Sequence, residues 1–193
     1  PRGTLVVLHA GSTHNPTGVN PSPEQWKELA DHLEGKQILI DAAYLGLGEN
    51  LEEAVHGIRL FADREIPLMV AVSFSKNMTL YNKRTGILLV VPKNPDQAKI
   101  VQSHLISIAR GNFSSAPAQG QVIAGNILTD ANLRLEWEAE VAVVRKQLQM
   151  QRATLQECLQ RHDLDQGFPD LTKQRVIFSL IPLDPHEVEK LVR

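Results

Sequence analysis

The chain has few of the residues that support disulfides, metal clusters or nucleic-acid binding. Its 193 residues include one cysteine, Cys158, which excludes an internal disulfide and a cysteine-based zinc cluster. The formal net charge is −2 and no run of basic residues occurs, so nucleic acid is not an expected partner. The apolar runs are far shorter than the roughly 18 residues that span a bilayer, so no membrane segment is expected. What remains is an ordinary globular composition, 42% apolar.

Short apolar runs alternate with segments of helical periodicity. Strands are predicted at 4–9, 37–40, 67–74, 85–92 and 175–181, and helices at 22–35, 51–62, 95–109, 116–128, 130–160 and 184–193. This alternation is typical of an α/β fold with a mostly parallel sheet and flanking helices. Ser22 followed by Pro23 and Gln25 predicts a capping box at one helix start, and Gly35 predicts where that helix ends.

Three polar positions follow directly after predicted strands: the loop after His9, then Asp41, then Ser73 to Lys76. In open parallel sheets, ligands bind beyond the carboxyl ends of the strands, so we expect these positions to meet at one edge. Lys76 is either a solvated loop lysine or an amine that forms a Schiff base with a carbonyl compound. Asp41 is either a turn former or the partner of a protonated pyridine nitrogen.

Together, Lys76 and Asp41 match two requirements of pyridoxal phosphate, which needs an amine for its aldehyde and an acid for its ring nitrogen. Hydroxyl groups and a cation for the phosphate are available at three nearby positions: Ser73, Ser75 and Arg84. Asn15 and Tyr44 are candidate hydrogen-bond partners of the ring oxygen. Singly, Asn15 could shape an Asn-Pro turn and Tyr44 could be a core residue. In combination the residues indicate a pyridoxal phosphate site.

Four motifs then identify a family: "HNPTG" at 14–18, "DAAY" at 41–44, "SFSKN" at 73–77 and "YNKRTG" at 81–86. Their order and spacing resemble the class I pyridoxal-phosphate-dependent aminotransferases, in particular the cytoplasmic type of aspartate aminotransferase or a divergent paralogue of it. The resemblance implies the fold type I large domain of these enzymes. Residues 1–143 would be the later half of that cofactor-binding domain. Residues 144–193 would be the start of a small α+β domain, joined by a long helix.

The resemblance also implies a role for each site residue. Lys76 would form the imine with the cofactor and move the substrate proton, and Asp41 would pair with the pyridinium nitrogen. His14 would lie behind the ring and help to hold Asp41. Ser73 and Arg84 would bind the phosphate, with Ser75 in support. Asn15 and Tyr44 would bind the ring oxygen. Asn15 would also bind the substrate, and Arg110 would reach across a homodimer to bind a side-chain carboxylate of the substrate. No metal is implied.

The activity that the resemblance implies is a ping-pong transamination between aspartate or glutamate and 2-oxo acids, in a cytoplasmic homodimer. Two alternatives stay open. The chain could be a catalytically impaired or non-enzymatic relative, or the same carbanion chemistry could lead elsewhere, for instance to amino-acid racemisation. The similarity starts downstream of the family's phosphate loop and stops before its second substrate arginine, so the chain is expected to be part of a longer polypeptide.

Overall fold

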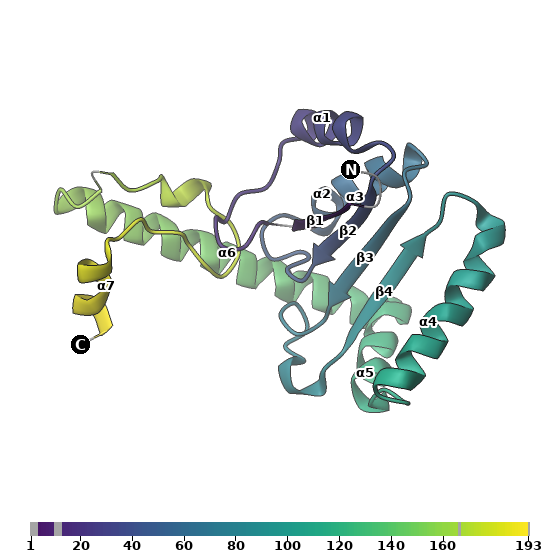
Figure 1. Cartoon of the computed structure of the whole chain (residues 1–193). Helices are drawn as coiled ribbons and strands as arrows, with labels where there is room; N and C mark the ends of the chain where they lie inside the picture. The colour runs from purple at the N-terminus through teal and green to yellow at the C-terminus, as the bar shows by residue number, and fades with distance from the viewer. Residues whose placement is uncertain (1–3, 10–12, 166, 193) are drawn as a thin grey trace.

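The computed structural model describes residues 4–9, 13–165 and 167–192. Figure 1 shows a sheet with α1 and α3 against it, α4 beside β4, and a long helix, α6, that extends away from it. The elements in chain order are β1 (Leu5–His9), α1 (Pro23–Leu33), β2 (Gln37–Ala42), α2 (Leu51–Ala54), α3 (His56–Asp63), β3 (Leu68–Ser73), the 3-10 helix η1 (Tyr81–Lys83), β4 (Gly86–Val91), the 3-10 helix η2 (Pro95–Gln97), α4 (Ala98–Asn112), α5 (Ala118–Thr129), α6 (Ala131–Arg161), the 3-10 helix η3 (Leu171–Lys173) and α7 (Pro185–Val192).

The sheet has the strand order β1-β2-β3-β4. The first three strands are parallel neighbours, and β4 runs antiparallel to β3. Helices connect the parallel strands, as a crossover between parallel neighbours requires. The mostly parallel sheet with flanking helices is therefore confirmed. Because β1, β2 and β3 point the same way, their carboxyl ends lie at one edge of the sheet.

One face of this sheet is buried under α1 and α3. Its strand residues include Ile38, Ile40 and Val70, all 1% exposed or less, and the helices contribute Trp26 and Phe61. The two aromatic rings meet edge to face, with centroids 6.1 Å apart. Burying such large side chains is the main stabilising contribution available to a domain of this kind.

A second apolar cluster joins the loop after β3 to the long helix α6. Phe74 and Met78 come from the loop, and Trp137 and Val141 come from the helix. The indole Nε1–H of Trp137 donates a hydrogen bond of 2.8 Å to the carbonyl oxygen of Asn77. This cluster therefore fixes the backbone next to Lys76.

The opposite face of the sheet is more open in the described part of the chain. Leu5 and Val7 share this face with His9, because side chains alternate along a strand, and they are 45% and 53% exposed. In β4, Leu88 is also exposed. No helix in the described ranges is both long and apolar enough to cross a membrane.

Most predicted elements lie within a few residues of their expected bounds. The capping box is present: the Ser22 hydroxyl accepts from the Gln25 N–H at 3.3 Å, and the Gln25 side chain accepts from the Ser22 N–H at 2.9 Å. Gly35 follows α1 with a φ of +73°, a conformation that glycine adopts without steric cost. Part of the loop predicted after His9, residues 10–12, lies outside the described residues.

Two predictions of secondary structure were wrong. The helix predicted at 51–62 is two helices, α2 and α3, interrupted at Val55. The break lets α3 begin anew with Gly57 against the Trp26 ring, where a Cβ would lie only 2.7 Å from ring atoms. The strand predicted at 175–181 is absent, because the carbonyl groups of Arg175, Val176 and Phe178 accept hydrogen bonds from a side chain instead of from a neighbouring strand.

Candidate active site

The carboxyl ends of the parallel strands bring three polar residues to one edge of the sheet. In the ladder, His9 at the end of β1 lies opposite Asp41 in β2, and Asp41 lies opposite Ala71 in β3. Ser73 ends β3 two residues further on and therefore projects to the same face as Asp41. The expectation that these strand ends meet is confirmed by the register.

Lys76, Tyr44 and Asn15 come together just beyond this edge. The Lys76 Nζ lies 4.8 Å from the centroid of the Tyr44 ring, within the range of a cation–π contact. The Asn15 side-chain amide donates to the Tyr44 hydroxyl oxygen at 3.2 Å. Three loops that are far apart in sequence thus place an amine, a phenol and an amide in one cluster.

Local backbone contacts explain how each of these side chains is presented. Asn15 lies in a turn closed by the Gly18 N–H, which donates to the His14 carbonyl at 2.9 Å. Tyr44 begins a turn directly after β2, in which the Leu47 N–H donates to the Tyr44 carbonyl at 3.0 Å. Polar residues next to strand ends favour such turns because their side chains and backbone groups form local hydrogen bonds.

Asp41 is half-buried, and its side chain accepts one hydrogen bond among the described residues, from the Ala43 N–H at 3.1 Å. A carboxylate has room for about four hydrogen bonds, so it retains acceptor capacity. Its neighbour across the ladder is His9, whose Nδ1 accepts from the Asn15 N–H at 3.2 Å. His9 thus links the Asp41 strand to the Asn15 loop.

His9 was not predicted as a site residue, whereas His14 was. In the structure His14 is exposed, its Nδ1 lies 2.8 Å from the Thr17 hydroxyl, and its ring centroid is 5.1 Å from that of His9. No hydrogen bond joins the His14 ring to Asp41 in the described part of the chain. The position of His9 at the very end of a strand neighbouring the Asp41 strand is the signal that could have found it.

The three candidate phosphate ligands lie on both sides of Lys76 in the sequence. The Ser73 hydroxyl accepts from the Ser75 N–H at 3.2 Å, and Ser75 is 6% exposed. Arg84 follows η1 in the left-handed region, with a φ of 50°, and its guanidinium donates to the Tyr81 carbonyl at 3.1 Å. Arg84 is exposed, so its remaining donors are accessible to an anion.

Arg110 lies apart from this cluster, in the last turn of α4. It is exposed, and no ion pair is recorded for it among the described residues.

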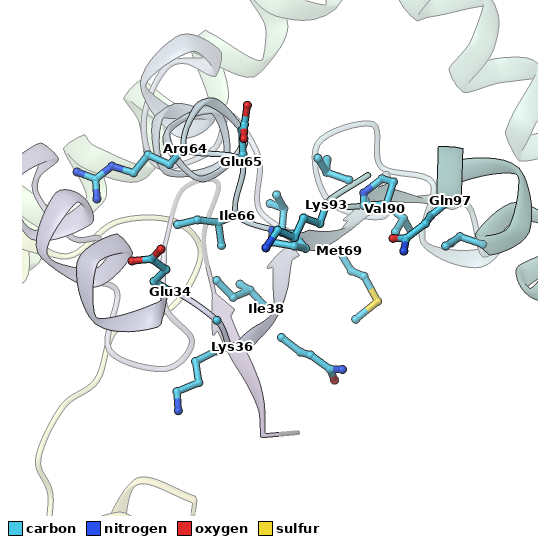
Figure 2. Close-up of a pocket in the computed structure, with 17 residues that line it drawn as sticks. Glu34, Lys36, Ile38, Arg64, Glu65, Ile66, Met69, Val90, Lys93 and Gln97 are labelled. Carbon is cyan, nitrogen blue, oxygen red and sulfur yellow. The ribbon is translucent and has the colours of Figure 1, made fainter. Parts of the chain in front are cut away.

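Three cavities lie in the described part of the molecule near the sheet, and neither Tyr44 nor Asn15 lines any of them. Lys76 lines a cavity of about 400 Å³ between its own loop and α6, while His14 lines a different one of about 720 Å³. A further cavity of about 790 Å³ lies at the amino ends of β2 and β3, where Figure 2 shows Lys36, Met69 and Lys93. That cavity is at the opposite edge of the sheet from Lys76. Among the described residues, no group of three or more acidic, His or Cys side chains is placed to hold a metal ion.

Comparisons with known proteins identify the family of the chain. The family model described as Aminotransferase class I and II matches residues 2–193. The chain is 38% identical over 191 residues to an aspartate aminotransferase of Haemophilus influenzae, covering 98% of this chain and 48% of that protein. It is 37% identical over 193 residues to an aromatic-amino-acid aminotransferase of Pseudomonas aeruginosa, covering 99% and 48% respectively.

The fold gives the same result. A crystal structure of an aromatic-amino-acid aminotransferase from Burkholderia pseudomallei, covalently bound to pyridoxal phosphate, matches with a TM-score of 0.92 at 34% identity. The match covers 98% of this chain and 48% of that one. The chain spans about half the length of the curated relatives it matches, 48% for the two named above. With a family model that covers nearly all its residues, the chain belongs to the class I and II aminotransferases.

Proposed function

We propose that the protein containing this chain is a transaminase that uses pyridoxal phosphate to move an amino group between aspartate or glutamate and 2-oxo acids. The observation that carries the proposal is the cluster of Lys76, Tyr44 and Asn15 at the carboxyl edge of the sheet. Membership of the aminotransferase family supports amino-group transfer. The relatives are named for different amino acids, aspartate in one case and aromatic amino acids in another, so the preferred amino acid is to be determined by kinetic measurement.

The donor set at the site fits this cofactor. When bound, pyridoxal phosphate supplies an electron sink for the negative charge that develops at the α-carbon of an amino acid. Asp41 has acceptor capacity for a protonated ring nitrogen, and the Asn15–Tyr44 pair offers donors for a ring oxygen. Ser73 and Arg84 would hold the phosphate, with Ser75 in support.

Lys76 is the residue that we assign to proton transfer. Its amine lies on a flexible four-carbon stem, so it can remain anchored at the backbone while the Nζ moves between positions. In its neutral form the amine would take the proton from the substrate α-carbon as a general base and would return it, as a general acid, to the carbon on the other side of the amino nitrogen. The Tyr44 ring beside the Nζ limits where the amine can go.

Arg110 supports the preference for dicarboxylic substrates. A guanidinium pairs with a carboxylate through two parallel hydrogen bonds, which makes arginine selective for such groups. Its exposure and its place in the last turn of α4 fit a role towards a second subunit in a homodimer. We also propose that residues 1–143 and 144–193 belong to a large and a small domain, and that the protein is cytoplasmic.

Absorbance and chemical trapping test the proposal. The polypeptide containing these residues is mixed with pyridoxal phosphate, and the adduct is reduced with borohydride and located by mass spectrometry. We expect a shifted cofactor absorbance and a label on Lys76, both lost in Lys76→Ala. Lys93→Ala, at the opposite edge of the sheet, is the matched control and should behave as wild type.

The outcome also separates the alternative functions. Equal spectra and labelling in wild type and Lys76→Ala would refute cofactor capture at this site and favour a non-enzymatic relative. If the cofactor is captured, incubation with L-aspartate and a 2-oxo acid should yield a new amino acid. Conversion of L-aspartate to the D-enantiomer without any new amino acid would instead establish racemisation.

A further inference from the structure

Arg152 in α6 is a buried arginine whose hydrogen bonds go to backbone carbonyls instead of carboxylates. It is 7% exposed. Its guanidinium donates to the carbonyl oxygens of Arg175 at 3.2 Å, of Val176, and of Phe178 at 2.7 Å. Its Nε donates to the Ser179 hydroxyl at 3.1 Å. Burial and the nearby Arg175 lower the pKa of this guanidinium.

Removing a guanidinium from water is unfavourable, so an arginine is buried in this way only where its donors are satisfied. Here the acceptors belong to one irregular segment, residues 174–180. A second set of contacts closes that segment: the Gln174 side chain accepts from the Leu180 N–H at 3.0 Å and donates to its carbonyl at 3.2 Å. Figure 1 shows this part of the chain running back alongside α6. Its shape therefore depends on Arg152.

The same segment touches both the Asn15 loop and Tyr44. The Arg175 N–H donates to the Gly18 carbonyl at 2.7 Å. Gly18 has a φ of +69°, and a Cβ there would lie 2.8 Å from the Gln174 Cβ, so the two segments approach closely. The Phe178 ring meets the Tyr44 ring edge to face, with centroids 5.2 Å apart and planes at 80°.

We propose that Arg152 is a positioning residue for Tyr44, acting through residues 174–180. It fixes the segment that carries Phe178, and Phe178 limits the orientation of the Tyr44 ring. That orientation sets where the Tyr44 hydroxyl meets Asn15 and where the ring lies under the Lys76 Nζ. The consequence for catalysis rests on the proposed function, whereas the link from Arg152 to Tyr44 does not.

Fluorine NMR of the full-length protein without cofactor tests the link directly. The protein is labelled with 3-fluorotyrosine, and the Tyr44 signal is assigned by its loss in Tyr44→Phe. We expect Phe178→Leu and Arg152→Gln both to move or broaden this signal. Arg134→Gln is the matched control, because Arg134 lies on the same helix and makes an exposed ion pair with Glu138. It should leave the signal unchanged.

A milder variant covers the case in which Arg152→Gln does not fold. Ser179→Ala removes one acceptor of Arg152 and no charge, and we expect a smaller change of the Tyr44 signal in the same direction. A Tyr44 signal at its wild-type position in a folded Arg152→Gln protein would overturn the proposal. So would an unchanged signal in Ser179→Ala, if Arg152→Gln is unfolded.

A readout with bound cofactor connects the link to activity. The pH at which the absorbance of the bound cofactor changes by half should shift in Arg152→Gln in the same direction as in Tyr44→Phe. The kcat should fall about tenfold to a hundredfold, as when a catalytic group is misplaced by about 1 Å. A moved Tyr44 signal in a protein that does not transaminate would refute the proposed function alone, and an active enzyme with an unmoved signal would refute the positioning role alone.

Discussion

Gly120 is the point at which α5 touches the loop that carries Arg84. A Cβ at Gly120 would lie 1.7 Å from the Thr85 Oγ1 and 2.9 Å from the Thr85 Cβ. Thr85 is 7% exposed, and its hydroxyl donates to the Lys83 carbonyl at 3.2 Å, so its side chain has little room to rotate away. We therefore expect Gly120→Ala to force α5 and the Arg84 loop apart.

Gly125 in the same helix is a matched control, because a Cβ there would meet no atom within 4 Å. Replacing glycine by alanine inside a helix stabilises it by about 1 kcal/mol, and Gly125→Ala should show that gain. At Gly120 the same gain is opposed by overpacking, which costs about 1–3 kcal/mol. Because the overlap is large, the overpacking cost should lie near its upper limit of about 3 kcal/mol. After the helix gain of about 1 kcal/mol is subtracted, Gly120→Ala should lower the free energy of unfolding by about 2 kcal/mol.

Urea unfolding of the polypeptide that contains these residues measures both changes. The two variants should shift the midpoint in opposite directions. If Arg84 binds the phosphate, Gly120→Ala should also weaken pyridoxal phosphate binding, and Gly125→Ala should not. Adding Thr85→Ala to Gly120→Ala should recover part of the lost stability, because the two residues are in contact. Midpoints that move alike in the two glycine variants would refute the close approach.

Two further predictions concern charge. Arg110→Ala should lower kcat/KM for aspartate roughly a hundredfold, a loss of about 3 kcal/mol of transition-state stabilisation, because a substrate carboxylate would be left unpaired. Equal losses for aspartate and an aromatic amino acid would contradict the assigned role. Burial raises the pKa of the Glu49 carboxyl above 4.5, although the Asn20 amide that donates to it at 2.8 Å opposes the shift. The folded state then favours the protonated form of the Glu49 carboxyl more than the unfolded state does. The free energy of unfolding therefore falls as pH rises from 4.5 through the raised pKa, and it remains lower above that pKa. Urea unfolding across this range should show the fall in wild type and not in Glu49→Gln, and a fall of the same size in both would contradict the assignment.

The parts of the site that could be predicted are those fixed by local sequence. Strand ends follow from short apolar runs, and parallel strands place their carboxyl ends together, so Asp41 and Ser73 could be assigned to one edge. The capping box at Ser22 is likewise a four-residue pattern. His9 was missed because a histidine at the end of an apolar run reads as a strand residue, and its strand-end position was not weighed together with that of Asp41, which lies opposite it in the ladder.

The segment at 174–180 could not be predicted, because its conformation depends on a side chain more than 20 residues away in sequence. An apolar run such as "RVIFSLI" satisfies the pattern of a buried strand, yet a strand needs a neighbour to pair with. In the structure three carbonyls of this run, those of Arg175, Val176 and Phe178, accept from Arg152, a long-range contact that no local pattern reports.

The lysine at the tip of a buried strand is held by its neighbours on both sides. Before it, the Ser75 N–H donates to the Ser73 hydroxyl, which turns the chain at the end of β3. After it, Asn77 is held through its carbonyl by Trp137 and through its amide, which donates to the Leu45 carbonyl at 3.2 Å. The Leu45 carbonyl belongs to the residue after Tyr44, so one side chain ties the lysine loop to the tyrosine turn. A lysine whose backbone is fixed at both ends, while its long side chain stays flexible beside a positioned aromatic ring, fits the role of proton carrier between two atoms that we propose for Lys76.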